Sequence, residues 1–166
     1  CALPISDCSA GAGLQADLKT FQHFQVFGLT AITCVVSETP IIVRKVHPVP
    51  VDVVADQVEL LLESYPVGAI KTGMLFSLEH IQRIAAILER YPHIPLVVDP
   101  VMIASTGTPL IEPEAIAAYQ EMLLPKAWLI TPNLPEAQTL LDGREISSTN
   151  IEQCAQDLAE KYSTNV

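Results

Sequence analysis

Three polar residues that could bind a cation and phosphates follow two apolar segments of this chain. Asp99 comes directly after the segment 96–98, and Asn133 and Glu136 follow the segment 128–130. Carboxylate and amide oxygens are the hard ligands that hold Mg²⁺ and its waters beside a triphosphate. Asn133 and Glu136 stand at the start of an expected helix with a spacing that lets both side chains turn toward one point. The pattern therefore favours phosphoryl transfer.

Each of these residues also has a structural explanation. Asn133 could cap the helix N-terminus, and Glu136 could be a first-turn carboxylate that the helix dipole favours. Lys71, at the end of another apolar segment, could pair with a phosphate or with a neighbouring carboxylate, and the sequence favours neither. The coincidence of these residues with Asp99 and a glycine loop favours the ligand interpretation.

The glycine loop, residues 9–13, comes immediately before an expected helix. Its small residues would leave backbone N–H groups free at a helix N-terminus, where an anion or another polar ligand can approach closely. The loop also matches G-x-G-x-x-A through Gly11, Gly13 and Ala16, and Glu38 ends the next expected strand, as in a dinucleotide-binding fingerprint. An NAD-dependent oxidoreductase is therefore an alternative of another class. An NAD-binding domain has no need for Asp99, Asn133 and Glu136 as oxygen ligands after the other strands. These residues therefore favour a kinase, an enzyme that transfers a phosphoryl group.

The elements that must position these residues alternate between strands and helices. Apolar runs typical of strands cover 29–36, 41–46, 67–70, 96–98 and 128–130. Helical spacing covers 13–24, 53–62, a helix that Ser77 opens, one that Pro113 leads, a short helix through Leu141, and 149–162. The alternation predicts an α/β fold with a doubly wound, mainly parallel sheet covered by helices on both faces. Ligands of such sheets bind at the carboxyl ends of the strands. Residues 41–49 are the one stretch expected outside the main sheet, as a flap.

Composition narrows the class of protein. The 166 residues are 49% hydrophobic with a net charge of −10, and their nine Lys and Arg residues are scattered, which excludes the footprint of a protein that binds nucleic acid or an anionic membrane. No apolar run reaches the length of a membrane helix. The four cysteines form no C-x-x-C pair, which fits reduced thiols in the cytoplasm. We expect a soluble, cytoplasmic protein that acts on a small molecule.

Residues 1–5 form an unusual start. They are what one reading frame through the end of a common sequencing adapter would encode, so we expect a non-native leader and leave these residues out of the predicted elements. Residues 6–166 are expected to form the N-terminal part of a single domain.

Four motifs together resemble one enzyme family. They are SDCSAGAGLQADLKTF at 6–21, KTGML at 71–75, VVDPVM at 97–102 and LITPNLPEA at 129–137. In order and spacing they are similar to the hydroxymethylpyrimidine/phosphomethylpyrimidine kinases of the ribokinase-like superfamily, and the first and last motifs are specific. The match runs from Ser6 to the end of the chain. Pyridoxal kinases are the nearest relatives with which this family can be confused.

The resemblance implies an activity and a set of site residues. Members of the family use MgATP to phosphorylate 4-amino-5-hydroxymethyl-2-methylpyrimidine and then its monophosphate, and a soluble cytosolic homodimer is expected for the complete enzyme. The residues implied to line the pyrimidine pocket are Ala12, Asp17, Val36, Met74 and Val101, together with Glu38 at a position where the family usually has Gln. Asp99, Asn133 and Glu136 would organise Mg²⁺, in part through water, and these three with Lys71 would contact the phosphates.

This sequence departs from the family pattern in three ways. A carboxylate at Glu38 can accept a hydrogen bond from the pyrimidine amino group but donates none unless it is protonated. Thr108 stands where the family usually has Asp. The later Lys-Gly-Gly-His and Gly-Thr-Gly-Cys motifs have no match here, so the catalytic base is expected beyond residue 166 and the 166-residue chain is expected to be inactive. Asn165 and Val166 would start the next strand.

Two further interpretations stay open at this point. One is a pyridoxine/pyridoxal kinase of the same superfamily. The other is a pyrimidine-binding protein without catalytic activity.

Overall fold

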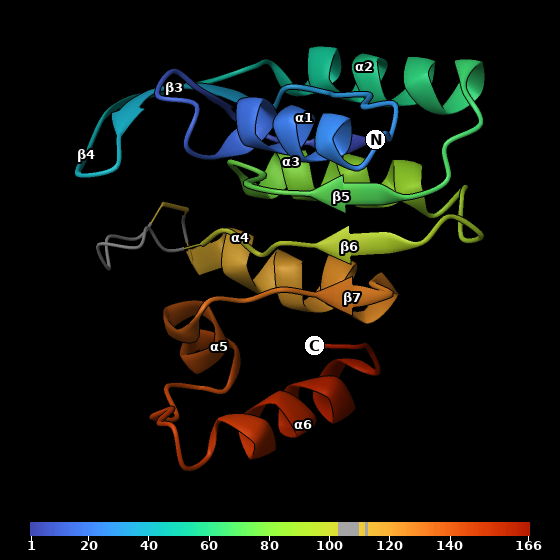
Figure 1. Ribbon diagram of the computed structural model, residues 1–166. Coiled ribbons are helices and arrows are strands. Elements are labelled where there is room, and N and C mark those ends of the chain that lie inside the picture. The colour runs from blue at the N-terminus through green and yellow to red at the C-terminus, as the bar shows by residue number, and fades with distance from the viewer. Residues whose placement is uncertain (103–109, 112) are drawn as a thin grey trace.

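The computed structural model describes residues 1–102, 110–111 and 113–166. Its main sheet has four strands in the order β1-β5-β6-β7, and every pairing between neighbours is parallel. The strands are β1 (Ala2–Leu3), β5 (Ile70–Thr72), β6 (Leu96–Val98) and β7 (Leu129–Ile130). Because all four run the same way, their carboxyl ends meet at one edge, on the left in Figure 1. The predicted α/β class with a mainly parallel sheet is confirmed.

A smaller sheet stands beside the first. It contains β2 (Ser6–Asp7), β3 (Cys34–Thr39) and β4 (Ile42–Pro48), with β2 parallel to β3 and β3 antiparallel to β4. The β3–β4 hairpin extends past the carboxyl edge of the main sheet (Figure 1). β4 lies outside the main sheet, as predicted for residues 41–49, but β3 does too, so 41–49 is not the one stretch that stands apart.

Backbone hydrogen bonds join the two sheets along the N-terminal segment. Ala2 N–H donates to Leu29 O at 2.8 Å, Ala31 N–H to Ala2 O at 2.9 Å, and Thr33 N–H to Pro4 O at 3.0 Å. The predicted strand 29–36 therefore does run alongside residues 2–7, although regular strand geometry begins only at Cys34. Residues 1–5, which the predicted elements leave out, contribute to the fold, because Ala2 and Leu3 are fully buried and pair with β5. Their assignment as a non-native leader stays a prediction.

Helices cover both faces of the main sheet. Figure 1 shows α1 in front of it and α3 and α4 behind it. The helices are α1 (Gly13–His23), α2 (Val51–Ser64), α3 (Leu78–Leu88), α4 (Pro113–Ala118), α5 (Leu134–Leu140) and α6 (Ile151–Tyr162), and α4 continues into a π-helix (Tyr119–Leu123) and a 3₁₀ turn (Leu124–Lys126). None of the helices within the described ranges has both the length and the apolar character needed to cross a membrane.

The core lies mainly between the sheet and the layer formed by α2, α3 and α4. From α3 it takes Ile81, Ile84 and Ile87, all at most 2% exposed, which fits the predicted apolar face of that helix. Ser77 caps α3 as predicted, since its hydroxyl accepts a hydrogen bond from His80 N–H. The strand predicted at 67–70 is also displaced: β5 runs from Ile70 to Thr72, and residues 66–69 belong to the loop that leaves α2.

Candidate functional site

A pocket of about 870 Å³ opens between the glycine loop, the strand ends and the β3–β4 hairpin. Its lining includes five of the six predicted substrate residues: Ala12, Val36, Glu38, Met74 and Val101. Val36 and Met74 are almost fully buried and form an apolar cluster with Cys34, against which Val101 packs. The structure thus brings side chains from four separate segments together around one cavity, with a carboxylate among apolar walls. Their role as substrate contacts stays a prediction.

The glycine loop at the rim of this pocket is held from inside by Asp7. Its carboxylate accepts hydrogen bonds from Ser9 N–H at 2.7 Å, Ala12 N–H at 2.8 Å and Gly11 N–H at 3.0 Å, and from the Ser9 hydroxyl at 3.0 Å. Burial raises the pKa of Asp7, but these hydrogen bonds outweigh it and leave the pKa below its ordinary value. The expectation of free N–H groups for an anion is therefore wrong here, because a carboxylate of the same chain already binds them.

The close packing of this loop explains one glycine. Gly13 has a φ of +59°, in the left-handed region that favours glycine. A Cβ at this position would lie 2.4 Å from the carbonyl oxygen of Ile5. Gly13 is thus required by the fold at the start of α1, and Asp7, directly before the loop, is the functional-site residue that the sequence reasoning missed.

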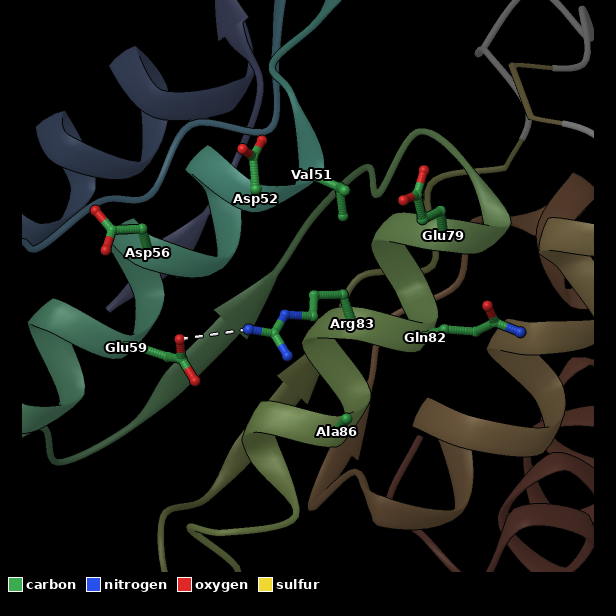
Figure 2. A pocket seen from close by; sticks show the side chains of 8 residues that line it. All are labelled: Val51, Asp52, Asp56, Glu59, Glu79, Gln82, Arg83 and Ala86. Atoms are coloured by element: carbon green, nitrogen blue, oxygen red, sulfur yellow. Dashed lines mark ion pairs between the residues drawn. The ribbon is translucent and has the colours of Figure 1, made fainter.

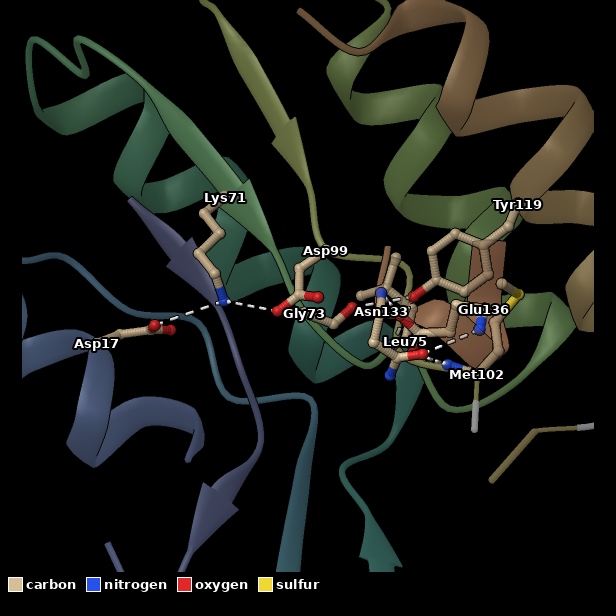
Figure 3. A network of polar contacts seen from close by, with 9 residues as sticks. All are labelled: Asp17, Lys71, Gly73, Leu75, Asp99, Met102, Tyr119, Asn133 and Glu136. Atoms are coloured by element: carbon tan, nitrogen blue, oxygen red, sulfur yellow. Dashed lines mark hydrogen bonds and ion pairs between the residues drawn. The ribbon is translucent and has the colours of Figure 1, made fainter. Parts of the chain in front are cut away.

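Lys71 lies between two carboxylates at the strand ends (Figure 3). Its Nζ is 3.4 Å from Asp17 Oδ1 of α1 and 3.4 Å from Asp99 Oδ2 after β6. Burial raises the pKa of Asp99, Lys71 opposes that rise, and Asp17 adds to it, so the pKa stays above its ordinary value. Of the two alternatives for Lys71, the structure has the carboxylate pairing. Asp17 contacts Lys71 rather than lining the pocket that the described residues form.

Asn133 and Glu136 form a capping box at the start of α5. The Asn133 side chain accepts from Glu136 N–H at 2.9 Å, and Glu136 Oε2 accepts from Asn133 N–H at 2.9 Å. Glu136 Oε1 accepts from Met102 N–H at 3.2 Å, and the residue is 2% exposed. The two side chains do turn toward each other, but both carboxylate oxygens are occupied by backbone groups. The structural explanation from the sequence is the one that the geometry supports.

The side chains of Asp99, Asn133 and Glu136 are not arranged for direct coordination of Mg²⁺. Within the described ranges no group of three or more His, Cys, Asp and Glu side chains is placed to hold a metal ion. Asp99 faces Lys71, and the Glu136 oxygens accept from backbone N–H groups. Thr108, the other departure from the family pattern, lies outside the described residues.

Two buried hydroxyls hold the loop that carries Met74 after β5. Tyr119, on the π-helix and fully buried, donates to Gly73 O at 2.9 Å and accepts from Leu75 N–H at 3.0 Å. Thr33 donates to Met74 O at 2.8 Å. Burial raises the pKa of Tyr119 above its ordinary value, so the hydroxyl keeps its proton. Sequence reasoning gave neither residue a role, because their partners lie more than forty positions away.

A second cavity, of about 660 Å³, lies between α2 and α3 (Figure 2). Four acidic residues line it, Asp52, Asp56, Glu59 and Glu79, and Arg83 forms an ion pair with Glu59 at 3.6 Å. None of the predicted site residues belongs to this lining. The pocket beside the glycine loop is therefore the better candidate for a small-molecule site.

Comparison with known proteins gives the same result as the motifs. The family model described as phosphomethylpyrimidine kinase matches residues 7–166. The hydroxymethylpyrimidine/phosphomethylpyrimidine kinase of Bacillus subtilis is 43% identical over 143 residues, which are 86% of this chain and 52% of that protein. The enzyme of the same description from Haemophilus influenzae is 41% identical over 161 residues, 97% of this chain and 60% of the relative. The chain thus spans little more than half the length of these relatives.

Solved structures resemble the chain equally well. The crystal structure of phosphomethylpyrimidine kinase from Clostridium difficile aligns with a TM-score of 0.87 at 34% identity. The alignment covers 96% of this chain and 69% of the Clostridium difficile chain. An ADP complex of Bacillus subtilis pyridoxal kinase has a TM-score of 0.86 at 34% identity, with 97% and 61% covered. With the motifs, the parallel sheet and the family match in agreement, this chain belongs to the phosphomethylpyrimidine kinase family.

Proposed function

We propose that the whole protein transfers a phosphoryl group from ATP to 4-amino-5-hydroxymethyl-2-methylpyrimidine and then to its monophosphate, as a step of thiamine biosynthesis. The observation that carries this proposal is the pocket at the carboxyl edge, where Val36, Met74 and Val101 supply apolar walls and Glu38 supplies a carboxylate with an oxygen that no described residue pairs. A flat heterocycle with one polar edge suits such a lining. The names of the relatives support the pyrimidine as substrate.

The chemistry divides between binding the acceptor and stabilising the moving charge. Phosphoryl transfer depends on in-line positioning of the two reactants and on electrostatic stabilisation of the transferred group. Lys71, held 3.4 Å from Asp17 and from Asp99, is the cation at the strand ends that we assign to the phosphates. Mg²⁺ is expected to accompany ATP, and contacts from Asp99, Asn133 and Glu136 through water are predictions from the family resemblance. The catalytic base is expected beyond residue 166.

A steady-state assay of ADP release tests the proposal. The whole protein should turn over the pyrimidine with MgATP, and the 166-residue chain should bind the pyrimidine without turnover. Met74→Ala in the whole protein should raise the KM for the pyrimidine about tenfold or more, because the variant removes a buried apolar wall. Met122→Ala, which removes the same side chain from the edge of the main core, serves as the matched control and should leave KM unchanged. Turnover without dependence on Met74 would contradict the placement of the substrate.

A pyridoxal kinase is the second candidate, because pyridoxal kinases are among the solved structures that match. That of Staphylococcus aureus in complex with AMP-PCP and pyridoxal is 38% identical with a TM-score of 0.82. The same assay with pyridoxal in place of the pyrimidine compares the two substrates directly. We expect the larger kcat/KM for the pyrimidine. A larger value for pyridoxal would reverse the order of the two candidates. A homodimer and a cytoplasmic location are further expectations of the family resemblance.

A further inference from the structure

Among the described residues that line the pocket, Glu38 is the one carboxylate with an oxygen that has no partner. It lies near the end of β3, opposite Val43, where the register between β3 and β4 shifts after Ser37. Such irregularities turn a side chain away from the regular alternation of a strand. Glu38 lines the pocket, and its Oε1 is buried with no hydrogen-bond partner among the described residues. No hydrogen bond among the described residues uses this oxygen.

The charged and titratable groups around Glu38 do not neutralise it. Asp7 of β2 lines the same pocket, and the Cys8 thiol contacts the Glu38 backbone, with Sγ 3.3 Å from the carbonyl oxygen. Arg44 and Lys45 of β4 also line the pocket, but neither forms an ion pair with Glu38 within the described part of the chain. Burial raises the pKa of Glu38, and the negative charge of Asp7 raises it further. The surroundings therefore make protonation of Glu38 easier than that of an ordinary exposed glutamate.

The proposed substrate has a polar edge that a carboxylate alone cannot satisfy. An aminopyrimidine presents an amino group, which donates, beside a ring nitrogen, which accepts. A carboxylate only accepts, so its second oxygen would face the lone pair of the ring nitrogen. A carboxylic acid accepts from the amino group with one oxygen and donates to the ring nitrogen with the other. A protonated ring facing a carboxylate gives the same pair of hydrogen bonds, so either arrangement contains one additional proton.

On the basis of the proposed function, we infer that binding of the aminopyrimidine takes up one proton, which is shared between the Glu38 carboxyl group and the ring nitrogen. A glutamine amide at this position would donate one hydrogen bond and accept the other with no proton taken up from solution. The proton uptake is therefore a consequence of the carboxyl group in this chain. Linkage then requires affinity to fall by up to about tenfold per pH unit where both free partners are deprotonated.

Isothermal titration calorimetry of the whole protein in two buffers of different ionisation enthalpy, such as Tris and HEPES, measures the proton uptake. At about pH 8, where an ordinary carboxyl group is deprotonated, the protein should take up close to one proton per pyrimidine bound. Glu38→Gln should bind the pyrimidine with no uptake, and its melting temperature checks that it folds. As a ligand control, an analogue with CH in place of the ring nitrogen beside the amino group should bind without proton uptake.

The outcomes separate this inference from the function on which it rests. Pyrimidine binding without proton uptake, or equal uptake by Glu38→Gln, overturns the inference and leaves the kinase proposal intact. Absence of pyrimidine binding by both proteins overturns the two together.

Discussion

Two glutamates at the carboxyl edge of the sheets, Glu136 and Glu38, have opposite surroundings. Glu136 is 2% exposed, and both of its oxygens accept hydrogen bonds from backbone N–H groups of Asn133 and Met102. Glu38 lines the pocket with one buried oxygen that has no partner in the described part of the chain. The same type of side chain therefore stabilises the fold in one region and, in the other, lines the pocket with an oxygen that no described residue pairs. Position near the carboxyl end of a strand does not distinguish these two surroundings, whereas occupancy of the oxygens by backbone N–H groups does.

The largest expected effect is the loss of stability when Glu136, the glutamate held by backbone N–H groups, is removed. Glu136→Ala removes the capping box and leaves the N–H groups of Asn133 and Met102 without their acceptor. Unsatisfied buried donors and a lost cap should together lower the free energy of unfolding by about 2–4 kcal/mol. Urea denaturation measures the loss.

Glu38→Ala is the matched control for that experiment. It removes the same carboxylate from a site where no hydrogen bond among the described residues depends on it, so the free energy of unfolding should change by less than about 1 kcal/mol. Equal losses in the two variants would show that occupancy in the folded state does not separate the two regions.

A second test compares two uncharged side chains, the buried Tyr119 hydroxyl with two backbone partners and the Tyr162 hydroxyl with a side-chain partner. Tyr119→Phe leaves Gly73 O and Leu75 N–H unpaired in the core, at an expected cost of about 1–3 kcal/mol. The control is Tyr162→Phe, which loses a single hydrogen bond to the Gln120 side chain, and about 1 kcal/mol or less is expected there. Because Tyr119 fixes the loop that carries Met74, its variant should also weaken pyrimidine binding, whereas the Tyr162 variant should not. Calorimetric titration of both variants checks this difference.

The sequence predicts the regular part of the fold better than its polar contacts. The run 96–98 coincides with β6, and Ser77 caps α3, because apolar runs and capping residues act locally. β1 was not predicted because residues 1–5 were set aside as a leader, and its pairing with β5, almost seventy positions away, has no local signal. The partner of Lys71 on α1, Asp17, lies fifty-four positions away, so no local pattern indicates that pair.

For the candidate site, the family motifs located the pocket walls, but they did not separate ligands from caps. Asn133 and Glu136 have a spacing that suits a shared cation and equally suits a capping box. The two possibilities differ only in whether backbone N–H groups already occupy the side-chain oxygens. That occupancy depends on Met102, which a different strand end contributes.

The smallest expected effect concerns Asp7, which lines the pocket with Glu38 but has its oxygens occupied like Glu136. Its pKa is lowered in the folded protein, because hydrogen bonds from Ser9, Ala12 and Gly11 outweigh burial. A lowered pKa gives stability that is complete above the unfolded value of 3.8 and is lost as the pH falls through the folded value. Asp7→Asn should cost about 1–2 kcal/mol at neutral pH and should show a flatter fall of stability below about pH 4 than the unchanged protein. Urea denaturation across this range measures both.

Because hydrogen bonds within the chain occupy both Asp7 oxygens, Asp7→Asn should leave the proton uptake on pyrimidine binding unchanged. A loss of that uptake would place Asp7, rather than Glu38, opposite the ring.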